Sequence, residues 1–381
     1  MKNTSFVSLQ ALVFALVAAA FTTVYITQPV LPVIRSEFGV TAATASLTVS
    51  AVILGIALAN LPFGALADRL PVKRIILVGG VAVAVCGFIC GLTHNLGVLV
   101  GARFVQGLFI PALTTCLAAY LSGVLPLERL NVVMGSYVSA TVTGGLGGRL
   151  LGGWIHPPLH WRYAFFTASL LLLGATWAAV RWLPPERQGR GGTEDSDSFL
   201  KLFRQPGLFR VYWVAFGAMF VYSSVFNYLP FYLSGPPFFK STEFITLLYL
   251  TYITGIVMGP AAGTLSNRIG NGGTMVLGAA IFAIALLATL IKSIGLVVLA
   301  LIGICAGFFA IHAAAAGALN RKLAGSRGRA NSLYVLLYYL GGAAGITLNG
   351  YAYSLAGWPG VVGLGLLLLG FPLATGLQEM R

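Results

Sequence analysis

Long apolar stretches separated by short polar turns follow one another along nearly the whole chain. A helix needs about 20 predominantly apolar residues to cross the hydrocarbon core of a bilayer, and by that measure the sequence predicts twelve membrane-spanning helices. Their expected ranges are 6–28, 44–66, 75–93, 97–121, 131–153, 163–183, 208–233, 243–265, 273–291, 294–318, 331–353 and 359–377. We therefore expect an all-α membrane protein.

A polar stretch between the sixth and seventh spans divides them into two groups. It runs from Pro184 to Pro206 and contains an acidic cluster at 194–197. Such a composition is typical of a linker outside the membrane. The expected organisation is an N-terminal six-helix half at residues 1–185, a cytoplasmic linker at 186–206 and a C-terminal six-helix half at 207–381.

Short sequence patterns recur about 200 positions apart. Residues 64–69 resemble residues 263–268, and the pair Arg129 and Asn131 recurs as Arg329 and Asn331. Recurrence at one offset indicates an internal duplication. Repeated membrane halves are how many secondary transporters build alternating access, so we expect two pseudo-symmetric halves.

Composition and charge support a membrane location. Of the 381 residues, 58% are hydrophobic and 8% are charged, whereas soluble proteins carry about 25% charged residues. The net charge of +14 lies in short clusters between apolar runs, which excludes a basic nucleic-acid-binding face. With the N-terminus inside, 17 of the 23 Lys and Arg residues are cytoplasmic and four are external. This bias predicts cytoplasmic N- and C-termini.

Three motifs in the first half resemble those of the major facilitator superfamily. The turn after the second span carries Gly64, Asp68, Arg69, Lys73 and Arg74, with Pro71 where the family usually has glycine. The fourth span carries Arg103-x-x-Gln106-Gly107. The fifth span carries the glycines of an antiporter-like motif, Gly144, Gly147, Gly148, Gly152 and Gly153, with Arg149 where that motif usually has proline.

This resemblance implies the major facilitator fold, and the motifs are closest to those of bacterial drug and metabolite efflux branches. It also implies that the turn around Asp68 is a conformational latch, which holds the cytoplasmic side closed when the transporter opens outward. A location in the bacterial cytoplasmic (inner) membrane follows from the same resemblance.

Polar and ionisable side chains inside the expected spans are candidate substrate-cavity residues, because such groups are costly in lipid and usually face a protein cavity. They are Tyr25, Arg103, Gln106, Arg149, Asn227, Tyr252, His312 and Tyr338. Arg103 and Gln106 share one helix face, although Arg103 could instead extend to the outer membrane surface. Arg149 could face the cavity or extend outward near Trp154. His312 could carry protons, although a lone histidine within helix packing is the more common case.

The acidic residues narrow the class of substrate. None of the nine Asp and Glu residues lies deep in an expected span, whereas many proton-coupled exporters and cation pumps rely on an intramembrane carboxylate. A neutral or anionic substrate is therefore favoured over a cationic one. Arginine binds carboxylates and phosphates with two hydrogen bonds, and an aromatic-lined pocket suits amphiphilic molecules.

The sequence predicts a secondary active transporter of a small organic molecule, most directly a proton-coupled exporter of an amphiphilic compound or metabolite. The alternative is an organic-anion importer or exchanger that uses Arg103, with Arg149 as a second cation. A membrane enzyme or lipid scramblase is a third hypothesis, but no nucleophile–base pair, P-loop or metalloprotease motif supports it.

We expect no enzymatic activity, no cofactor and no metal site. The expected partners are the substrate, protons as coupling ion and the lipid bilayer, and the protein is expected to be a monomer.

Overall fold

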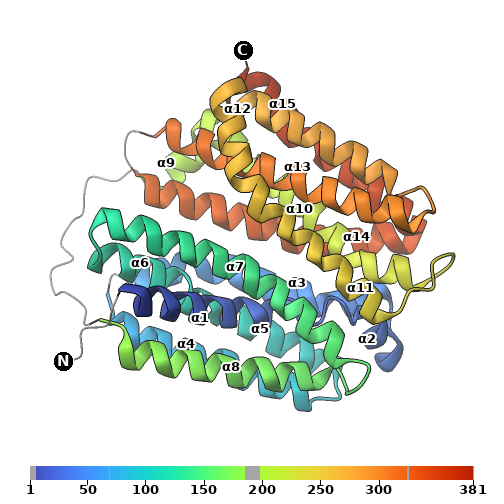
Figure 1. The fold of residues 1–381 in the computed structure, drawn as a ribbon, viewed down its shortest axis with the longest axis horizontal. Helices are drawn as coiled ribbons and strands as arrows, with labels where there is room; N and C mark the ends of the chain where they lie inside the picture. Colours follow the sequence, from blue (N-terminus) through green and yellow to red (C-terminus); the bar gives the residue numbers. More distant parts are fainter. Residues whose placement is uncertain (1–5, 68, 185–197, 324–325, 381) are drawn as a thin grey trace. The chain divides into compact units, whose positions relative to one another are not determined.

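The structure is a computed structural model that describes residues 6–67, 69–184, 198–323 and 326–380. The described residues form helices joined by turns and contain no strand, which confirms the all-α prediction. The helices are α1 (Phe6–Val24), α2 (Leu31–Phe38), α3 (Ala42–Ala67), α4 (Val72–Leu92), α5 (Leu96–Leu113), α6 (Thr115–Val124), α7 (Leu127–Ile155), α8 (Arg162–Trp182), α9 (Phe199–Arg204), α10 (Pro206–Ser234), α11 (Thr242–Leu248), the 3-10 helix η1 (Tyr249–Ile253), α12 (Thr254–Ala288), α13 (Ile294–Arg321), α14 (Arg327–Leu368) and α15 (Gly370–Glu379) (Figure 1).

Several helix ends follow from local sequence. Asn95 caps α5 by accepting a hydrogen bond from the Val98 amide at 3.1 Å, as expected for a short polar side chain at this position. Pro206 starts α10, where its missing N–H costs nothing. Gly270 and Gly357 interrupt α12 and α14 with φ of 76° and 62°, a backbone conformation that favours glycine.

Nine helical segments of the described chain are long and apolar enough to cross a membrane. Two of them, Thr242–Ala288 with 47 residues and Gly328–Glu379 with 52, exceed the roughly 20 residues that one crossing needs. The predicted fifth span, α7, is not among the nine; its seven glycines and Arg149 lower its mean hydropathy. The multi-pass architecture is therefore established, and the count of twelve crossings stays a prediction.

At least three expected spans differ from the observed helices: the first, the fourth, and the eighth, which was predicted as one helix over 243–265 and is divided between α11, η1 and α12. The first was predicted to run to Gln28, but α1 ends at Val24 and the chain turns before α2 begins. The fourth was predicted as one helix over 97–121, but α5 and α6 are divided at Thr114. Pro111 removes one backbone N–H from α5 close to that division, and a proline inside a helix commonly causes such an interruption.

The chain divides into two compact units. Unit 1 comprises Met1–Val30 and Ala51–Gly192, and unit 2 comprises Leu31–Ser50 and Thr193–Arg381. Residues 31–50, namely α2 and the first part of α3, thus belong to the unit that contains α10 to α15. Most of the predicted linker at 186–206 lies outside the described residues, which resume with α9 and its buried Leu202.

Unit 1 is held together by a close approach of α1 and α7, which run side by side in Figure 1. A Cβ atom added at Gly144 or Gly148 would lie 2.3 or 2.2 Å from a carbonyl oxygen of α1, and one added at Gly152 would lie 1.9 Å from that of Ile26, in the turn after α1. These glycines recur every four residues and therefore share one face of α7. Without side chains there, the two backbones can pack at a distance that no larger residue allows.

Unit 2 repeats this arrangement with α10 and α14. A Cβ atom at Gly341 would lie 2.2 Å from the Phe216 carbonyl oxygen, and one at Gly345 would lie 2.3 Å from that of Phe220. The glycines again recur every four residues, on the helix that corresponds to α7. Glycine contacts of the same kind thus occur in both units.

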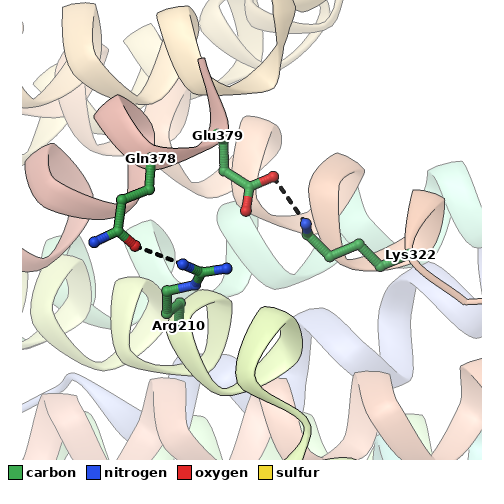
Figure 2. A network of polar contacts seen from close by, with 4 residues as sticks. All are labelled: Arg210, Lys322, Gln378 and Glu379. Carbon is green, nitrogen blue, oxygen red and sulfur yellow. Dashed lines mark hydrogen bonds and ion pairs between the residues drawn. The ribbon is translucent and has the colours of Figure 1, made fainter. Parts of the chain in front are cut away.

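Polar contacts fix the C-terminal helix of unit 2 to two other helices (Figure 2). Arg210 of α10 donates a hydrogen bond to Gln378 of α15 at 2.7 Å. Lys322, which follows α13, pairs with Glu379 at 2.9 Å. The first contact joins exposed side chains and the second joins partly exposed ones. An ion pair of the second kind contributes about 0–1 kcal/mol, so these contacts orient α15 more than they stabilise the unit.

The glycine contact between α1 and α7 generates a prediction. Gly152→Ala should lower the free energy of unfolding by about 1–3 kcal/mol, because its Cβ cannot fit against the Ile26 carbonyl oxygen without moving the turn after α1. Gly135→Ala on the same helix, where nothing lies within 4 Å, is the matched control and should be neutral or slightly stabilising. Thermal unfolding of the detergent-purified variants measures both, and equal melting temperatures for the two would contradict the packing argument.

Candidate functional site

The break after α1 is where four of the predicted site residues gather. Residues 25–30 form two successive turns, with hydrogen bonds from the Gln28 amide to the Tyr25 carbonyl at 3.1 Å and from Val30 to Thr27 at 3.2 Å. The carbonyl groups at the end of α1 have lost their helical donors. Because unpaired polar groups are costly in apolar surroundings, they need donors from elsewhere.

Arg103 of α5 supplies these donors. Its side chain is fully buried, and its guanidinium group donates hydrogen bonds to the carbonyl oxygens of Thr23, at 2.6 Å, and of Val24. A third bond runs to Gln106 Oε1 at 2.5 Å, and Gln106 Nε2 in turn donates to the Val83 carbonyl at 3.1 Å. Arg103 thus caps the C-terminal end of α1, where a cation is favourable.

Arg149 of α7 contacts Tyr25 and Gln28 in the turns that follow α1. It is 3% exposed, and its Nε donates to Gln28 Oε1 at 2.6 Å while Nη1 donates to the Gly145 carbonyl at 2.7 Å. The guanidinium carbon lies 3.8 Å from the centre of the Tyr25 ring, a cation–π contact. The side chain is therefore directed into unit 1 and not outward near Trp154, and its role in a substrate cavity stays a prediction.

Two further cations of unit 1 also bind helix ends. Arg162, at the start of α8, is 7% exposed and donates twice to the carbonyl oxygen of Thr93, the C-cap residue of α4, at 3.1 and 3.0 Å. Lys73 donates to the carbonyl of Leu183, the C-cap residue of α8, at 2.5 Å. No sequence pattern pointed to Arg162, because its partner lies 69 positions away.

Three predicted site residues of unit 2 meet in one aromatic cluster. The Tyr252 and Tyr222 rings lie 5.3 Å apart, and Tyr222 stacks on Phe308 at 3.9 Å. Phe308 lies parallel to His312 on the same helix, and the His312 ring lies 5.2 Å from that of Tyr338. The cluster therefore draws on α10, η1, α13 and α14.

His312 is the one histidine of this cluster, and a nitrogen of its ring forms a hydrogen bond. Its Nδ1 lies 2.9 Å from the Tyr334 hydroxyl, and the side chain is partly exposed. The groups facing it are aromatic rings: Phe308 on its own helix and Tyr334 and Tyr338 on α14. No acidic or basic partner of His312 occurs among the contacts of the described residues.

Asn227 stands apart from both groups. It is fully buried on α10, and its Nδ2 donates to Ser46 Oγ of α3 at 2.8 Å. The structure thus distributes the predicted cavity residues over three places. Tyr25, Arg103, Gln106 and Arg149 surround the break after α1, Tyr252, His312 and Tyr338 form the aromatic cluster, and Asn227 contacts Ser46.

The latch motif is described only in part. Asp68 lies outside the described residues, so its pairing with the neighbouring cations stays a prediction. Arg69 and Arg74 are exposed, and Lys73 bonds to Leu183 as above. Gly64 has space around it, since an added Cβ would lie 3.9 Å from the nearest atom, on Thr115.

The linings of two open pockets in the described part of unit 2 include none of the predicted cavity residues, although the second lies next to Tyr252 in the sequence. One, of about 600 Å³, is lined by Arg35, Gly39, Val40, Thr41, Ala42, Thr44, Tyr353 and Ser354. The other, of about 560 Å³, is lined by Leu250, Thr251, Ile253, Thr254, Val257, Met258 and Ile302. Among the described residues no group of three His, Cys, Asp or Glu side chains could hold a metal ion.

Comparisons with known proteins agree with the predicted family and fold. The sequence profile of the Major Facilitator Superfamily matches residues 13–238. An uncharacterized transporter of Buchnera aphidicola subsp. Schizaphis graminum is 28% identical over 94% of this chain and 88% of its own. The inner membrane transport protein YnfM of Escherichia coli (strain K12) is 28% identical over 95% and 88%.

Solved structures match over the whole chain. A bacterial homologue of the human lysosomal transporter Spinster, crystallised in an inward-facing and unoccupied conformation, superposes with a TM-score of 0.75. The alignment covers 99% of this chain and 95% of that one, at 15% sequence identity. At this identity the match shows a shared fold, and the fold is the one that the sequence motifs predicted.

The capping geometry of Arg103 generates a second prediction. Arg103→Met should lower the free energy of unfolding by about 2–4 kcal/mol, because it leaves the buried carbonyls of Thr23 and Val24 without donors. Arg103→Lys should recover part of this loss, since an ammonium group can still donate. Thermal unfolding without any substrate measures the effect. A variant that keeps wild-type stability and loses only substrate binding would show that Arg103 is a cavity residue and not a cap.

Proposed function

Because the chain belongs to the Major Facilitator Superfamily, a family of transporters, we propose that it moves a small organic molecule across the membrane by alternating access, as a proton-coupled exporter of an amphiphilic compound or metabolite. Its family and its fold indicate a transporter and not an enzyme. The proposed location is the bacterial cytoplasmic membrane with both termini inside, which the charge bias of the turns supports.

The proposed substrate class is supported by the hydrogen-bond partners of two groups of predicted residues, namely those around the break after α1 and those of the aromatic cluster. Both candidate cations of unit 1 direct hydrogen bonds to the protein itself: Arg103 to the end of α1, and Arg149 to Gln28 and Gly145. The aromatic cluster of unit 2 offers ring faces and hydroxyl groups without a fixed charge. Such surfaces suit an amphiphilic or aromatic molecule.

The organic-anion alternative is less well supported by the same contacts. An anion at Arg103 would have to replace the bonds to Thr23 and Val24, and those carbonyls would then lose their donors. Since buried unpaired carbonyls are costly, substrate binding and the integrity of α1 would compete. We therefore rank neutral or weakly polar substrates first.

Proton coupling is proposed with His312 as the candidate carrier. Its imidazole is partly exposed and hydrogen-bonded to Tyr334. His312 is also the only histidine in the C-terminal half of the sequence, residues 207–381. Histidine changes charge within the physiological pH range when it is accessible to water. A state that opens the cluster to one side of the membrane would give His312 that access.

Reconstituted vesicles test the function and its coupling. Efflux of amphiphilic compounds by the wild type should fall to the passive rate when a protonophore collapses the proton gradient. His312→Gln should retain binding, measured as a ligand-induced rise in melting temperature, while its efflux no longer responds to the gradient. His160→Gln, outside the cluster, is the control.

Either of two results would change the proposal. Efflux that persists without the gradient would refute proton coupling but leave transport intact. Stabilisation by organic anions, lost in Arg149→Gln but not matched by amphiphiles, would favour the importer or exchanger.

A further inference from the structure

The short helix α9 has two faces with different surroundings. Leu202 is 1% exposed, whereas Leu200 is 56% exposed, and the side chains of Lys201 and Arg204 are exposed as well. Residues four apart share a helix face, so Leu200 and Arg204 lie on one side of α9, with Lys201 beside them. This outer face of α9 (Leu200, Lys201 and Arg204) therefore combines an exposed apolar side chain with two cations.

The inner face of α9 is attached to the first turns of α10 and α14. The Phe203 ring lies parallel to that of the buried Tyr212 in the second turn of α10, with the ring centres 6.2 Å apart. The guanidinium carbon of Arg329, in the first turn of α14, lies 5.5 Å from the centre of the Phe199 ring. α9 thus folds back along α10 and does not extend away from unit 2.

The local sequence separates α9 from α10. Gln205 lies between the two helices in an extended conformation, with φ of −68° and ψ of 116°. Pro206 disfavours a helical backbone at the residue before it, so one continuous helix cannot form here. The position of α9 is therefore set by its contacts with α10 and α14.

These contacts determine the depth of α9 relative to the membrane. Under the proposed topology α10 and α14 both begin on the cytoplasmic side, and α9 lies beside the first turns of both. This is the level of the phospholipid headgroups. An exposed leucine beside basic side chains suits that level, because the leucine can enter the acyl region while the cations extend to phosphate groups.

The charge at this end of unit 2 favours an anionic partner. Within residues 198–380, Glu379 is the one acid that the predicted topology places on the cytoplasmic side, and it pairs with Lys322 at 2.9 Å. Clusters of basic residues next to a membrane span attract anionic lipid headgroups. The cations that the same topology places on this side are Lys201, Arg204, Arg210, Arg268, Arg321, Lys322, Arg327 and Arg329.

We propose that the outer face of α9 binds anionic phospholipid at the membrane surface, with Leu200 beside the acyl chains and Lys201 and Arg204 at the phosphate groups. The proposal goes beyond the transport function, since it needs neither substrate nor proton gradient. Because α9 is attached to α10 and α14, bound lipid would fix this end of unit 2 at the depth of the headgroups.

The test measures which lipids surround α9. A bimane fluorophore is attached at Q205C, an exposed position beside Arg204, after the four buried native cysteines have been replaced by alanine. The protein is placed in nanodiscs that contain either doxyl-labelled phosphatidylglycerol or doxyl-labelled phosphatidylcholine at the same mole fraction. The doxyl group quenches bimane at short range, so titrating the two lipids gives the ratio of their association constants at α9.

Phosphatidylglycerol should be preferred by the wild-type α9 sequence, and sodium chloride should weaken the preference because salt screens exposed charges. Lys201→Gln combined with Arg204→Gln should lower the ratio of association constants about fivefold for each cation removed. Leu200→Ser should reduce quenching by both lipids and leave their ratio unchanged, since it weakens insertion and keeps the charge.

A second double variant is the matched control. Arg181→Gln combined with Arg268→Gln removes the same charge from two exposed positions outside α9, both cytoplasmic under the predicted topology. It should keep the wild-type ratio. If the two double variants lowered the ratio equally, the preference would come from the overall charge of the protein, and the proposal would be overturned.

Two further results would also overturn it. One is equal quenching by the two lipids with the wild-type α9 sequence. The other is a preference that arises only after the acidic cluster of the linker has been neutralised by E194Q, D195N and D197N, because the linker and not lipid would then cover the cations.

Variants that do not run as a single folded species on size exclusion are replaced by Lys201→Met combined with Arg204→Met, for which the same loss of preference is expected. The quenching experiment contains no substrate, and efflux from vesicles is measured separately. A lipid preference without efflux would refute the proposed transport and support the lipid-binding surface. Efflux without a lipid preference would refute the surface and leave the transport function standing.

Discussion

Close approach of helix backbones at glycine is the constraint on which both units depend. In lipid, burial of apolar surface does not draw helices together, so packing and polar contacts must do so. Glycines spaced by four residues let α7 meet α1 and let α14 meet α10, with hypothetical Cβ atoms 2.2–2.3 Å from carbonyl oxygens of the facing helix. Each helix pair is therefore locked in register, and the site residues on it are positioned by that register.

The register decides where the charged groups lie. Because α7 is held against α1, Arg149 meets Tyr25 and Gln28 at the point where α1 ends. Arg103 reaches the same break from α5. In unit 1 cations thus satisfy the backbone where helices stop, at α1, α4 and α8. These cations stabilise helix ends. Because the backbone carbonyl dipoles already interact with the guanidinium groups, the positive potential that the arginines present to a substrate is reduced.

In unit 2 a neutral side chain donates to a backbone carbonyl at a helix end. The carbonyl of Thr289, the C-cap residue of α12, accepts from the Tyr232 hydroxyl at 2.9 Å, and its hydroxyl accepts from Trp358 Nε1 at 2.8 Å. Neutral donors and stacked rings leave this unit with few fixed charges in its helix contacts. Glycine contacts between helices thus occur in both units, whereas the polar groups described here are mainly arginines at helix ends in unit 1 and neutral side chains and aromatic rings in unit 2.

The sequence by itself determined the class of fold, because lipid imposes long apolar helices whose number of residues and flanking charges can be read along the chain. It also determined the glycine face of α7, since a period of four places glycines on one side of any helix. It could not determine where α1 ends, what Arg103 and Arg149 bind, or that Ser46 meets Asn227, 181 positions away. Those outcomes depend on which helices become neighbours. A buried arginine or asparagine has the same local sequence whether its partner is a substrate, a carbonyl group or a serine, and only tertiary packing selects among them.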